Sequence, residues 1–241
     1  MLEELPINGV ADADLRSERT TTQQSLAGGA LTEDLALARL KDPELTSEMV
    51  EQICQNAGAM KSRKVRMALA SGGRTPRRIA LRLIREFYTF ELMQFALRPS
   101  APPDLKRVAD ELLLGRLASI TLGERISLAR RSSATVAGGL LLDKEPRVWQ
   151  TALENPKLTE VAIVRALQRT GATVAFVEAL SQHPKWSPRL EIRVALLRNA
   201  HTPVSRAVEF ARRIPERQLR DILHSSRLPE KIKSLLRKER E

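Results

Sequence analysis

Cysteine, aromatic residues and long apolar runs are all scarce in this 241-residue sequence, and each scarcity excludes a class of protein. The single cysteine, Cys54, rules out an intrachain disulfide and any multi-cysteine zinc or iron–sulfur site. Aromatic residues make up only 3%, so the apolar content is mainly Leu, Ala, Val and Ile, from which close-packed helices are built. The uncharged stretch 132–142 is far shorter than the roughly 20 apolar residues of a membrane-spanning helix.

The first residues of the sequence also lack the pattern of a secretory signal. The opening residues, MLEELPINGV, include two acids where such a signal would carry positive charge, and no long apolar run follows them. Together with the single cysteine, this is typical of a reducing compartment. We therefore expect a soluble cytoplasmic protein without a transmembrane segment.

Charge is distributed unevenly along the chain. Residues 1–35 contain seven acids and two arginines, a net charge of −5, so the formal +11 of the whole chain leaves +16 on residues 36–241. An excess of positive charge favours association with anionic partners, but it does not by itself distinguish nucleic acid from an acidic protein.

The composition divides the sequence into two parts. Residues 1–30 mix Gly, Ala, Thr, Ser and Gln with scattered acids and show no sustained apolar period, which is typical of disorder. We place the boundary so that residues 1–34 are a disordered acidic tail and residues 35–241 are a helical-repeat domain.

Short amphipathic segments fill this second part. Each begins at Thr, Ser or Pro, the residues that start helices, and none alternates convincingly with the period of two that a strand requires. The predicted fold is all-α, an α-solenoid of short stacked helical repeats, because a short helix pair cannot bury its apolar face without stacked neighbours.

An internal repeat supports this prediction. Residues 65–113 align without a gap to the sequence that begins 127 positions later. Thr75 and Pro76 then meet Thr202 and Pro203, and the apolar positions downstream also coincide. We expect each Thr–Pro pair to start an equivalent helix, with the threonine as its N-cap.

The runs VRMALASGGRTP (65–76) and IRVALLRNAHTP (192–203) resemble the Val-Arg, Ala, Asn-Pro and Thr-Pro pattern of leucine-rich-repeat-variant and HEAT-like repeats. The resemblance covers residues 35–241 and implies a HEAT- or armadillo-like α-solenoid that binds or scaffolds other proteins. It does not extend to the iron–sulfur cofactor of some variant-repeat members, because no cysteine cluster precedes the repeats.

One stretch stands out by its charge. Residues 52–85 contain nine cations and no acid. In the helix expected after Pro76, Ile79, Leu83 and Phe87 belong to a core stripe, and three arginines at spacings of four and three lie on the outward face. The candidate residues for binding an anionic partner are Arg63, Lys64, Arg74, Arg77, Arg78, Arg82 and Arg85.

Two interpretations of this stretch remain open. Arginine supplies planar donor forks that suit phosphate or carboxylate, so the residues could form a ridge that contacts an anionic partner. They could equally form a solvated face of a basic protein, partly neutralised by the acidic tail.

The sequence offers no candidate catalytic residue, metal site or cofactor. It contains no HExxH, CxxC or GxxxxGK[ST] motif, and its three histidines lie in or beside expected turns. The aromatic cluster of Phe87, Tyr88, Phe90 and Phe95 has helical spacing and is expected in the core. Trp186 lies in an expected turn, and two interpretations of its ring remain open, burial in the core and an exposed contact with a partner.

Three hypotheses about function follow. The first is a non-enzymatic helical-repeat scaffold that binds a protein partner or an acidic surface, the commonest use of such stacks. The second is a nucleic-acid-binding solenoid that uses a basic ridge on phosphates. The third is a helical-repeat DNA glycosylase, whose charge preference would fit but whose cleft needs more aromatic rings than this chain contains.

Overall fold

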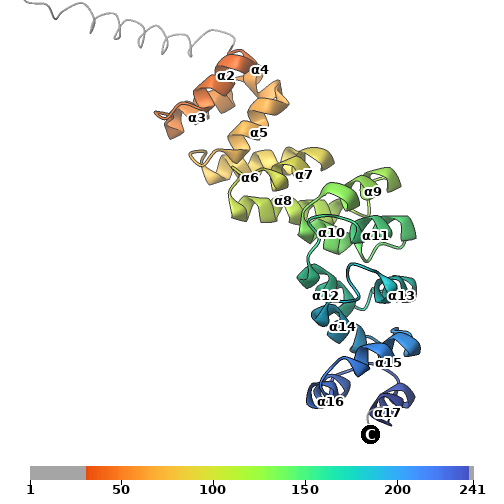
Figure 1. The fold of residues 1–241 in the computed structure, drawn as a ribbon. Helices are drawn as coiled ribbons and strands as arrows, with labels where there is room; N and C mark the ends of the chain where they lie inside the picture. Colours follow the sequence, from red (N-terminus) through yellow and green to blue (C-terminus); the bar gives the residue numbers. More distant parts are fainter. Residues whose placement is uncertain (1–30, 239–241) are drawn as a thin grey trace, which may run out of the picture. The chain divides into compact units, whose positions relative to one another are not determined.

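The computed structural model describes residues 31–238, which form sixteen α-helices, α2 to α17, and no strand (Figure 1). Helices account for 68% of these residues, which confirms the prediction of an all-α fold. Most of the helices have eight to ten residues, in keeping with the short amphipathic segments of the sequence. The disorder predicted for residues 1–30 lies outside the described residues.

Backbone contacts divide the chain into two compact units, and each is described by itself. Over the described residues, unit one comprises 31–87 and 98–105, and unit two comprises 88–97 and 106–238. The helical-repeat domain expected over residues 35–241 is therefore spread over two units.

Unit one is built from five helices and the start of a sixth. In unit one, α5 packs against α2, α4 and α6, and α3 packs against α4. The bounds are α2 (Glu33–Leu40), α3 (Ser47–Gln55), α4 (Ala57–Lys61), α5 (Arg63–Ser71) and α6 (Arg77–Glu86).

The first helix begins earlier than the sequence suggested. Leu31 is buried, and the hydroxyl of Thr32 accepts a hydrogen bond from the backbone N–H of Leu35 as the N-cap of α2. Glu33 and Asp34 had been assigned to the acidic tail, but they occupy the first helical turn, where the helix dipole favours negative charge. The boundary after residue 34 was therefore placed too late.

Unit two contains α7 (Thr89–Leu97), most of α8 (Pro103–Arg116) and all the helices that follow. Their bounds are α9 (Leu122–Arg131), α10 (Ala134–Leu140), α11 (Pro146–Leu153), α12 (Glu160–Gln168), α13 (Val174–Gln182), α14 (Leu190–Leu197), α15 (Val204–Arg212), α16 (Glu216–His224) and α17 (Glu230–Lys238).

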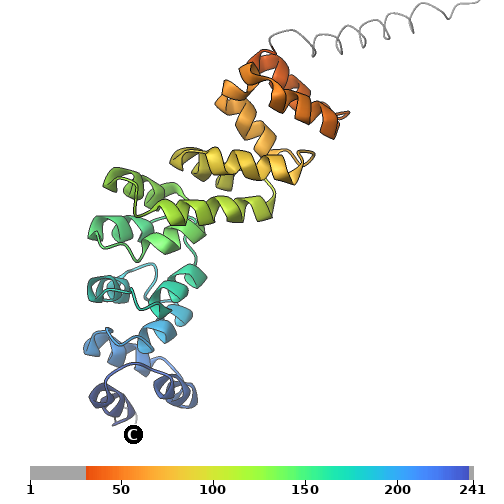
Figure 2. The same cartoon turned by 180° about the vertical axis from the view of Figure 1, so that it is seen from behind.

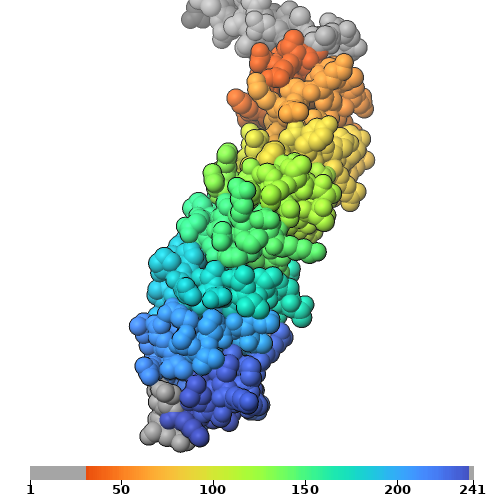
Figure 3. Space-filling view, turned by 90° about the vertical axis from the view of Figure 1, so that its right-hand side faces the viewer, coloured from red at the N-terminus to blue at the C-terminus, as the bar shows by residue number. Residues whose placement is uncertain are grey.

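The helices of unit two from α9 onward are arranged in two rows. In the even-numbered row, α10 contacts α12, α12 contacts α14 and α14 contacts α16. In the odd-numbered row, α9 contacts α11, α11 contacts α13 and α15 contacts α17. The two rows are seen as two columns of labels in Figure 1 and from behind in Figure 2. In the space-filling view the layers of this unit form consecutive bands from green to blue (Figure 3).

Polar side chains in the turns of unit two donate hydrogen bonds to carbonyls in the preceding layer of helices. Asn155 donates from Nδ2 to the carbonyl of Ala129 at 2.8 Å, and Asn199 donates to the carbonyl of Leu167 at 2.9 Å. The indole of Trp186 and the hydroxyl of Ser226 make the same kind of bond to helix-end carbonyls. Since the last carbonyls of a helix lack partners inside it, these bonds satisfy them and join successive layers.

The internal repeat is visible in the helix starts. Four helices, α5 to α8, start at residues 63, 77, 89 and 103, and α14 to α17 start at residues 190, 204, 216 and 230. Each start in the second set lies 127 positions after its counterpart, as the alignment predicts. The correspondence therefore holds for element bounds as well as for residue types.

The predicted caps at the Thr–Pro pairs are wrong in their detail. Pro76 and Pro203 occupy the N-cap positions of α6 and α15, and neither helix has a side-chain cap hydrogen bond. Thr202 instead donates its hydroxyl to the carbonyl of Leu196, whereas the Thr75 hydroxyl is buried without a hydrogen-bond partner among the described residues. The proline, whose φ suits a helix start, begins these helices.

Candidate functional site

Helix α6 positions the central arginines of the candidate site. Its Ile79, Leu83 and Ile84 are buried, which confirms the predicted core stripe. Because the remaining positions of the helix lie on the opposite face, Arg78 and Arg82 are directed to solvent.

All seven candidate residues lie in unit one and are exposed. They come from α5, from the turn after it and from α6. We use the name basic ridge for this set: Arg63, Lys64, Arg74, Arg77, Arg78, Arg82 and Arg85.

The stretch 52–85 contains no acid, but acids from other parts of the chain lie beside the ridge. Lys64 donates to Glu33 of α2 at 2.8 Å. Arg78 pairs with Glu51 of α3, and Arg77 pairs with the Asp104 carboxylate at the start of α8.

These three acids lie outside residues 52–85, so the charge count of that stretch could not include them. Arg74, in turn, donates to backbone carbonyls of Asp42 and Pro43. The expectation that no acid accompanies the arginines is therefore corrected by the packing of α2, α3 and α8.

These ion pairs balance the charge of three of the seven ridge cations, and they contribute little to stability. Arg78 has 77% of its side chain exposed and Glu51 has 39%. Exposed pairs of this kind contribute only about 0–1 kcal/mol, since water competes for both partners. Within residues 31–238, Arg82 makes no hydrogen bond or ion pair, so at least one ridge guanidinium has its donors available.

The pKa shifts around the ridge agree with this geometry. The hydrogen bond from Lys64, together with one from Ser62, lowers the pKa of Glu33, and the same contact with Glu33 raises the pKa of Lys64. Both groups therefore stay charged at neutral pH. Burial raises the pKa of the Cys54 thiol, an effect that the nearby Arg82 partly opposes.

The aromatic residues are placed differently from the expectation. Phe87 and Phe95 are buried as predicted, but Tyr88 is 66% exposed and Phe90 is 40% exposed, so core packing was wrong for these two. Tyr88 directly precedes α7 and Phe90 lies in its first turn, before the buried residues of that helix begin at Glu91. The open question about Trp186 is decided, because its ring is buried and its Nε1 donates to the Leu153 carbonyl at 3.0 Å.

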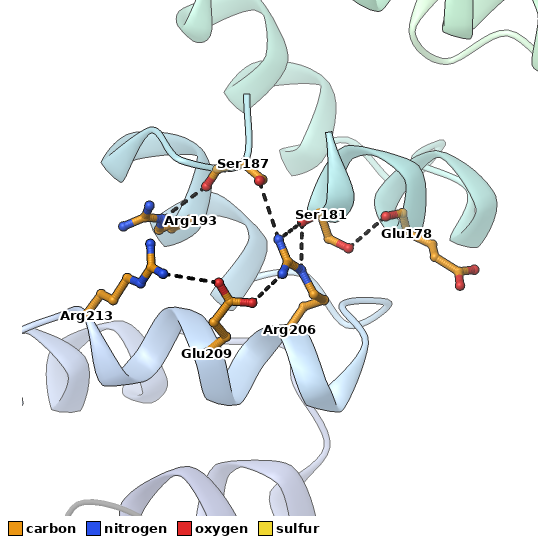
Figure 4. A network of polar contacts seen from close by, with 7 residues as sticks. All are labelled: Glu178, Ser181, Ser187, Arg193, Arg206, Glu209 and Arg213. Atoms are coloured by element: carbon orange, nitrogen blue, oxygen red, sulfur yellow. Dashed lines mark hydrogen bonds and ion pairs between the residues drawn. The ribbon is translucent and has the colours of Figure 1, made fainter. Parts of the chain in front are cut away.

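A polar network in unit two shows how other arginines are used structurally (Figure 4). Arg206 of α15 donates from Nε to the carbonyl of Ser181 at 2.8 Å and pairs with Glu209. Arg213 reaches the same carboxylate at 3.6 Å. The guanidinium of Arg206 also lies over the ring of Phe210, with its carbon 5.0 Å from the ring centroid. This network joins α15 to the end of α13.

Two grooves that sequence analysis did not anticipate lie on the even-numbered row of unit two. The first, of about 170 Å³, is formed by α10, α12 and the end of α8. The second, of about 180 Å³, is formed by α12, α14 and the turn after α16. Helix α12 contributes to both, so the grooves lie on either side of it. Their arginines lie in or just after helices that also carry acids, so no charge count singles them out.

The described residues contain no group of three or more His, Cys, Asp or Glu side chains that could hold a metal ion. Among the helices of residues 31–238, none is long and apolar enough to cross a membrane. Searches against protein-family models, curated proteins and solved structures returned no match, so the interpretation of function rests on this geometry.

Proposed function

We propose that this chain is a non-enzymatic binding protein, an α-solenoid of HEAT-like or leucine-rich-repeat-variant-like repeats that engages an acidic protein partner. The observation that carries the proposal is the exposure of the basic ridge: all seven cations lie at the surface of unit one. A scaffold of this kind uses an extended surface rather than a catalytic pocket.

Three features support the solenoid architecture. Even-numbered helices contact even-numbered ones, odd-numbered helices contact odd-numbered ones, and both patterns continue along unit two. The turn-to-layer hydrogen bonds recur at sequence separations of 26 to 33 residues. The helix starts repeat after 127 residues. A stack in which each layer contacts its neighbours produces all three features.

The ion pairs of the ridge are suited to exchange with a partner. The side chains of Arg77 and Arg78 are exposed and their acids are half-buried, and ion pairs of exposed arginines add little to folding stability. A carboxylate from a partner can replace Glu51 or Asp104 and offer both of its oxygens to the guanidinium group, the bidentate geometry that arginine favours. The partner therefore gains charge-assisted hydrogen bonds while the fold loses little.

Nucleic acid is the second candidate partner, because Arg78, Arg82 and Arg85 follow at helical spacing and would suit phosphates as well. The two candidates differ in their salt dependence. Binding through several phosphates falls by orders of magnitude between low and moderate salt, because counterions are released from the nucleic acid.

The test compares binding of labelled polyglutamate and labelled duplex DNA to the full chain, each at two salt concentrations. The Arg78→Glu/Arg82→Glu variant is expected to lower the affinity for polyglutamate about tenfold or more, the loss of roughly one charge-assisted hydrogen bond. Circular dichroism should show unchanged helix content, since both side chains are exposed.

The matched control is Arg130→Glu/Arg147→Glu, which makes the same change of charge at two exposed arginines of α9 and α11. This control is expected to retain binding. Equal losses in the two variants would show that only net charge matters, and tight, salt-sensitive binding to DNA alone would favour the nucleic-acid alternative.

A further inference from the structure

The groove between α10 and α12 combines an apolar floor with a cationic edge. Leu114, Leu142, Val161 and Ala162 contribute to the floor, and Arg165 and Arg169 extend from the α12 side. Val161 is 58% exposed, so its side chain is accessible to a ligand that enters the groove. The space of about 170 Å³ is several times the roughly 30 Å³ of a water molecule in the liquid, so it admits a side chain.

Two glycines of α10 line this groove. A Cβ atom on Gly138 would lie 3.0 Å from the Cβ of Ala162, and one on Gly139 would lie 2.4 Å from a methyl carbon of Leu114. Because neither glycine has a side chain, α10 approaches both α12 and the end of α8 closely. The groove floor is therefore made of small and aliphatic groups rather than of long polar ones.

The adjoining groove continues the same chemistry on the other side of α12. Val164 and Val194 contribute apolar surface, and Arg198 and Arg227 contribute positive charge beside the single acid Glu191. The amide of Asn199 in this groove is already engaged with the Leu167 carbonyl and the His201 backbone N–H. The arginines are therefore the charged groups left to bind an anion there, beside the amide of Gln168.

The guanidinium groups of these grooves differ from the structural arginines of unit two. Arg189, Arg206 and Arg125 each pair with a carboxylate. By contrast, the four groove arginines are exposed, and their side chains make no hydrogen bond or ion pair with the part of the chain that the structure describes. They are Arg165, Arg169, Arg198 and Arg227. Four cations with free donors beside apolar floors fit a ligand that offers both carboxylates and aliphatic groups.

We propose that the two grooves beside α12 form one binding site for an acidic, leucine- or valine-containing peptide segment of a partner protein. An aliphatic side chain of the segment enters the α10–α12 groove against Val161. Its carboxylates bind Arg165 and Arg169, and further along Arg198 and Arg227. This inference rests on the proposed function and adds to it a second site, in unit two, with a defined partner chemistry.

The lining favours a peptide over nucleic acid. No aromatic ring lines either groove, so unstacked bases would find no platform there. The apolar floor next to Val161 would be left in contact with water by a phosphate backbone, whereas an aliphatic side chain covers it.

The experiment measures binding of a labelled synthetic peptide of alternating Leu and Glu to the full chain by fluorescence anisotropy. The Arg165→Glu/Arg169→Glu variant is expected to weaken binding about tenfold or more, as expected when a charge-assisted hydrogen bond is lost. Arg130→Glu/Arg147→Glu on the odd-numbered row is the control of equal charge change and should bind like the native chain.

A second pair of variants tests the apolar contact without changing charge. Val161→Gln should weaken binding several-fold, and Val174→Gln on α13, where the valine is 56% exposed against 58% for Val161, should not. A peptide with Gln in place of each Glu should bind more weakly than the original. Equal affinity for the two peptides, equal effects within either variant pair, or binding of duplex DNA in place of the peptide would overturn the proposal.

The two proposals fail separately in these assays. If the ridge variant Arg78→Glu/Arg82→Glu loses polyglutamate while the groove variants keep the Leu/Glu peptide, the grooves have no independent role and this inference is wrong. If the groove variants lose the peptide while the ridge variant binds polyglutamate normally, the ridge proposal is wrong and the groove site stands.

Discussion

Helices α6 and α15 are equivalent elements of the internal repeat, and they share the same buried face. Both begin directly after a proline, at Arg77 and Val204. Three buried positions of α6 coincide with three buried positions of α15 at the separation of 127 residues; the pairs are Ala80 and Ala207, Leu83 and Phe210, and Ile84 and Ala211. Packing therefore keeps these positions apolar and buried in both copies, although two of the three pairs differ in residue type.

The outer faces of the two helices have diverged. Arg82 of α6 is exposed, and its equivalent is Glu209, which pairs with Arg206 and Arg213 (Figure 4). Arg206 in turn occupies the position of the buried Ile79. At this position the first copy has a cation without an ion pair among residues 31–238, whereas the second copy has an acid in the network through which Arg206 joins α15 to α13.

This divergence changes how the ridge must be tested. The repeat alignment suggests Arg206 as a control position in the second copy. The structure excludes it, because reversal of its charge would place a carboxylate against the Ser181 carbonyl and Glu209. Exposed arginines outside both the network and the grooves, such as Arg130 and Arg147, are the appropriate controls.

The largest expected effect concerns the turn before each of these helices, where Gly72 in the first copy corresponds to Asn199 in the second. Asn199→Gly removes the bond to the Leu167 carbonyl and the bond from the His201 backbone, both at 2.9 Å. We expect a loss of about 2–3 kcal/mol in the free energy of unfolding, because a buried carbonyl loses its partner. Urea denaturation monitored by circular dichroism measures it.

The control for this prediction is Gly72→Ala in the first copy. A Cβ there meets the Thr75 hydroxyl at 3.0 Å, so a change within about 1 kcal/mol is expected, as for most tolerated substitutions. Similar losses of unfolding free energy for Asn199→Gly and Gly72→Ala would contradict the prediction that the side-chain hydrogen bonds of Asn199 stabilise the turn of the second copy only.

Much of the fold could be predicted from the sequence, for reasons that these helices illustrate. Apolar spacing along α6 predicts that Ile79 and Leu83 are buried, and burial depends mainly on the helix's own periodicity. The prolines at 76 and 203 likewise mark both helix starts, since proline acts on local backbone geometry.

The site was harder to predict because it depends on which elements meet. The pair between Arg78 and Glu51 needs α3 to lie beside α6, and no local pattern encodes that approach. The groove beside Val161 is lined by Gly138 and Gly139, a pair of glycines that in the sequence indicates only a turn or close packing. The sequence shows that residues 52–85 contain no acid. It does not show that packing brings Glu33, Glu51 and Asp104 beside them.

A smaller effect is expected from the two threonines that precede α6 and α15. Thr202→Val removes a buried hydrogen bond of 2.6 Å to the Leu196 carbonyl and should cost about 1 kcal/mol. Thr75→Val should be neutral or slightly stabilising, because the buried Thr75 hydroxyl has no hydrogen-bond partner among residues 31–238. Melting temperatures of the two variants distinguish them, and equal losses would mean that Thr75 also forms a bond in solution.

The smallest expected effect is on the stability contribution of the ridge itself. Arg78→Gln, Glu51→Gln and the double variant should each unfold within about 0.5 kcal/mol of the native chain, because both partners are exposed and hydrated. A double-mutant cycle by urea denaturation, repeated at high salt, isolates the pair. A coupling free energy well above 1 kcal/mol would show that the Arg78–Glu51 pair has a structural role, like the contacts of the Arg206 network. A coupling near zero would show that the pair contributes nothing measurable to folding, so that a carboxylate from outside the chain could replace Glu51 without loss of stability.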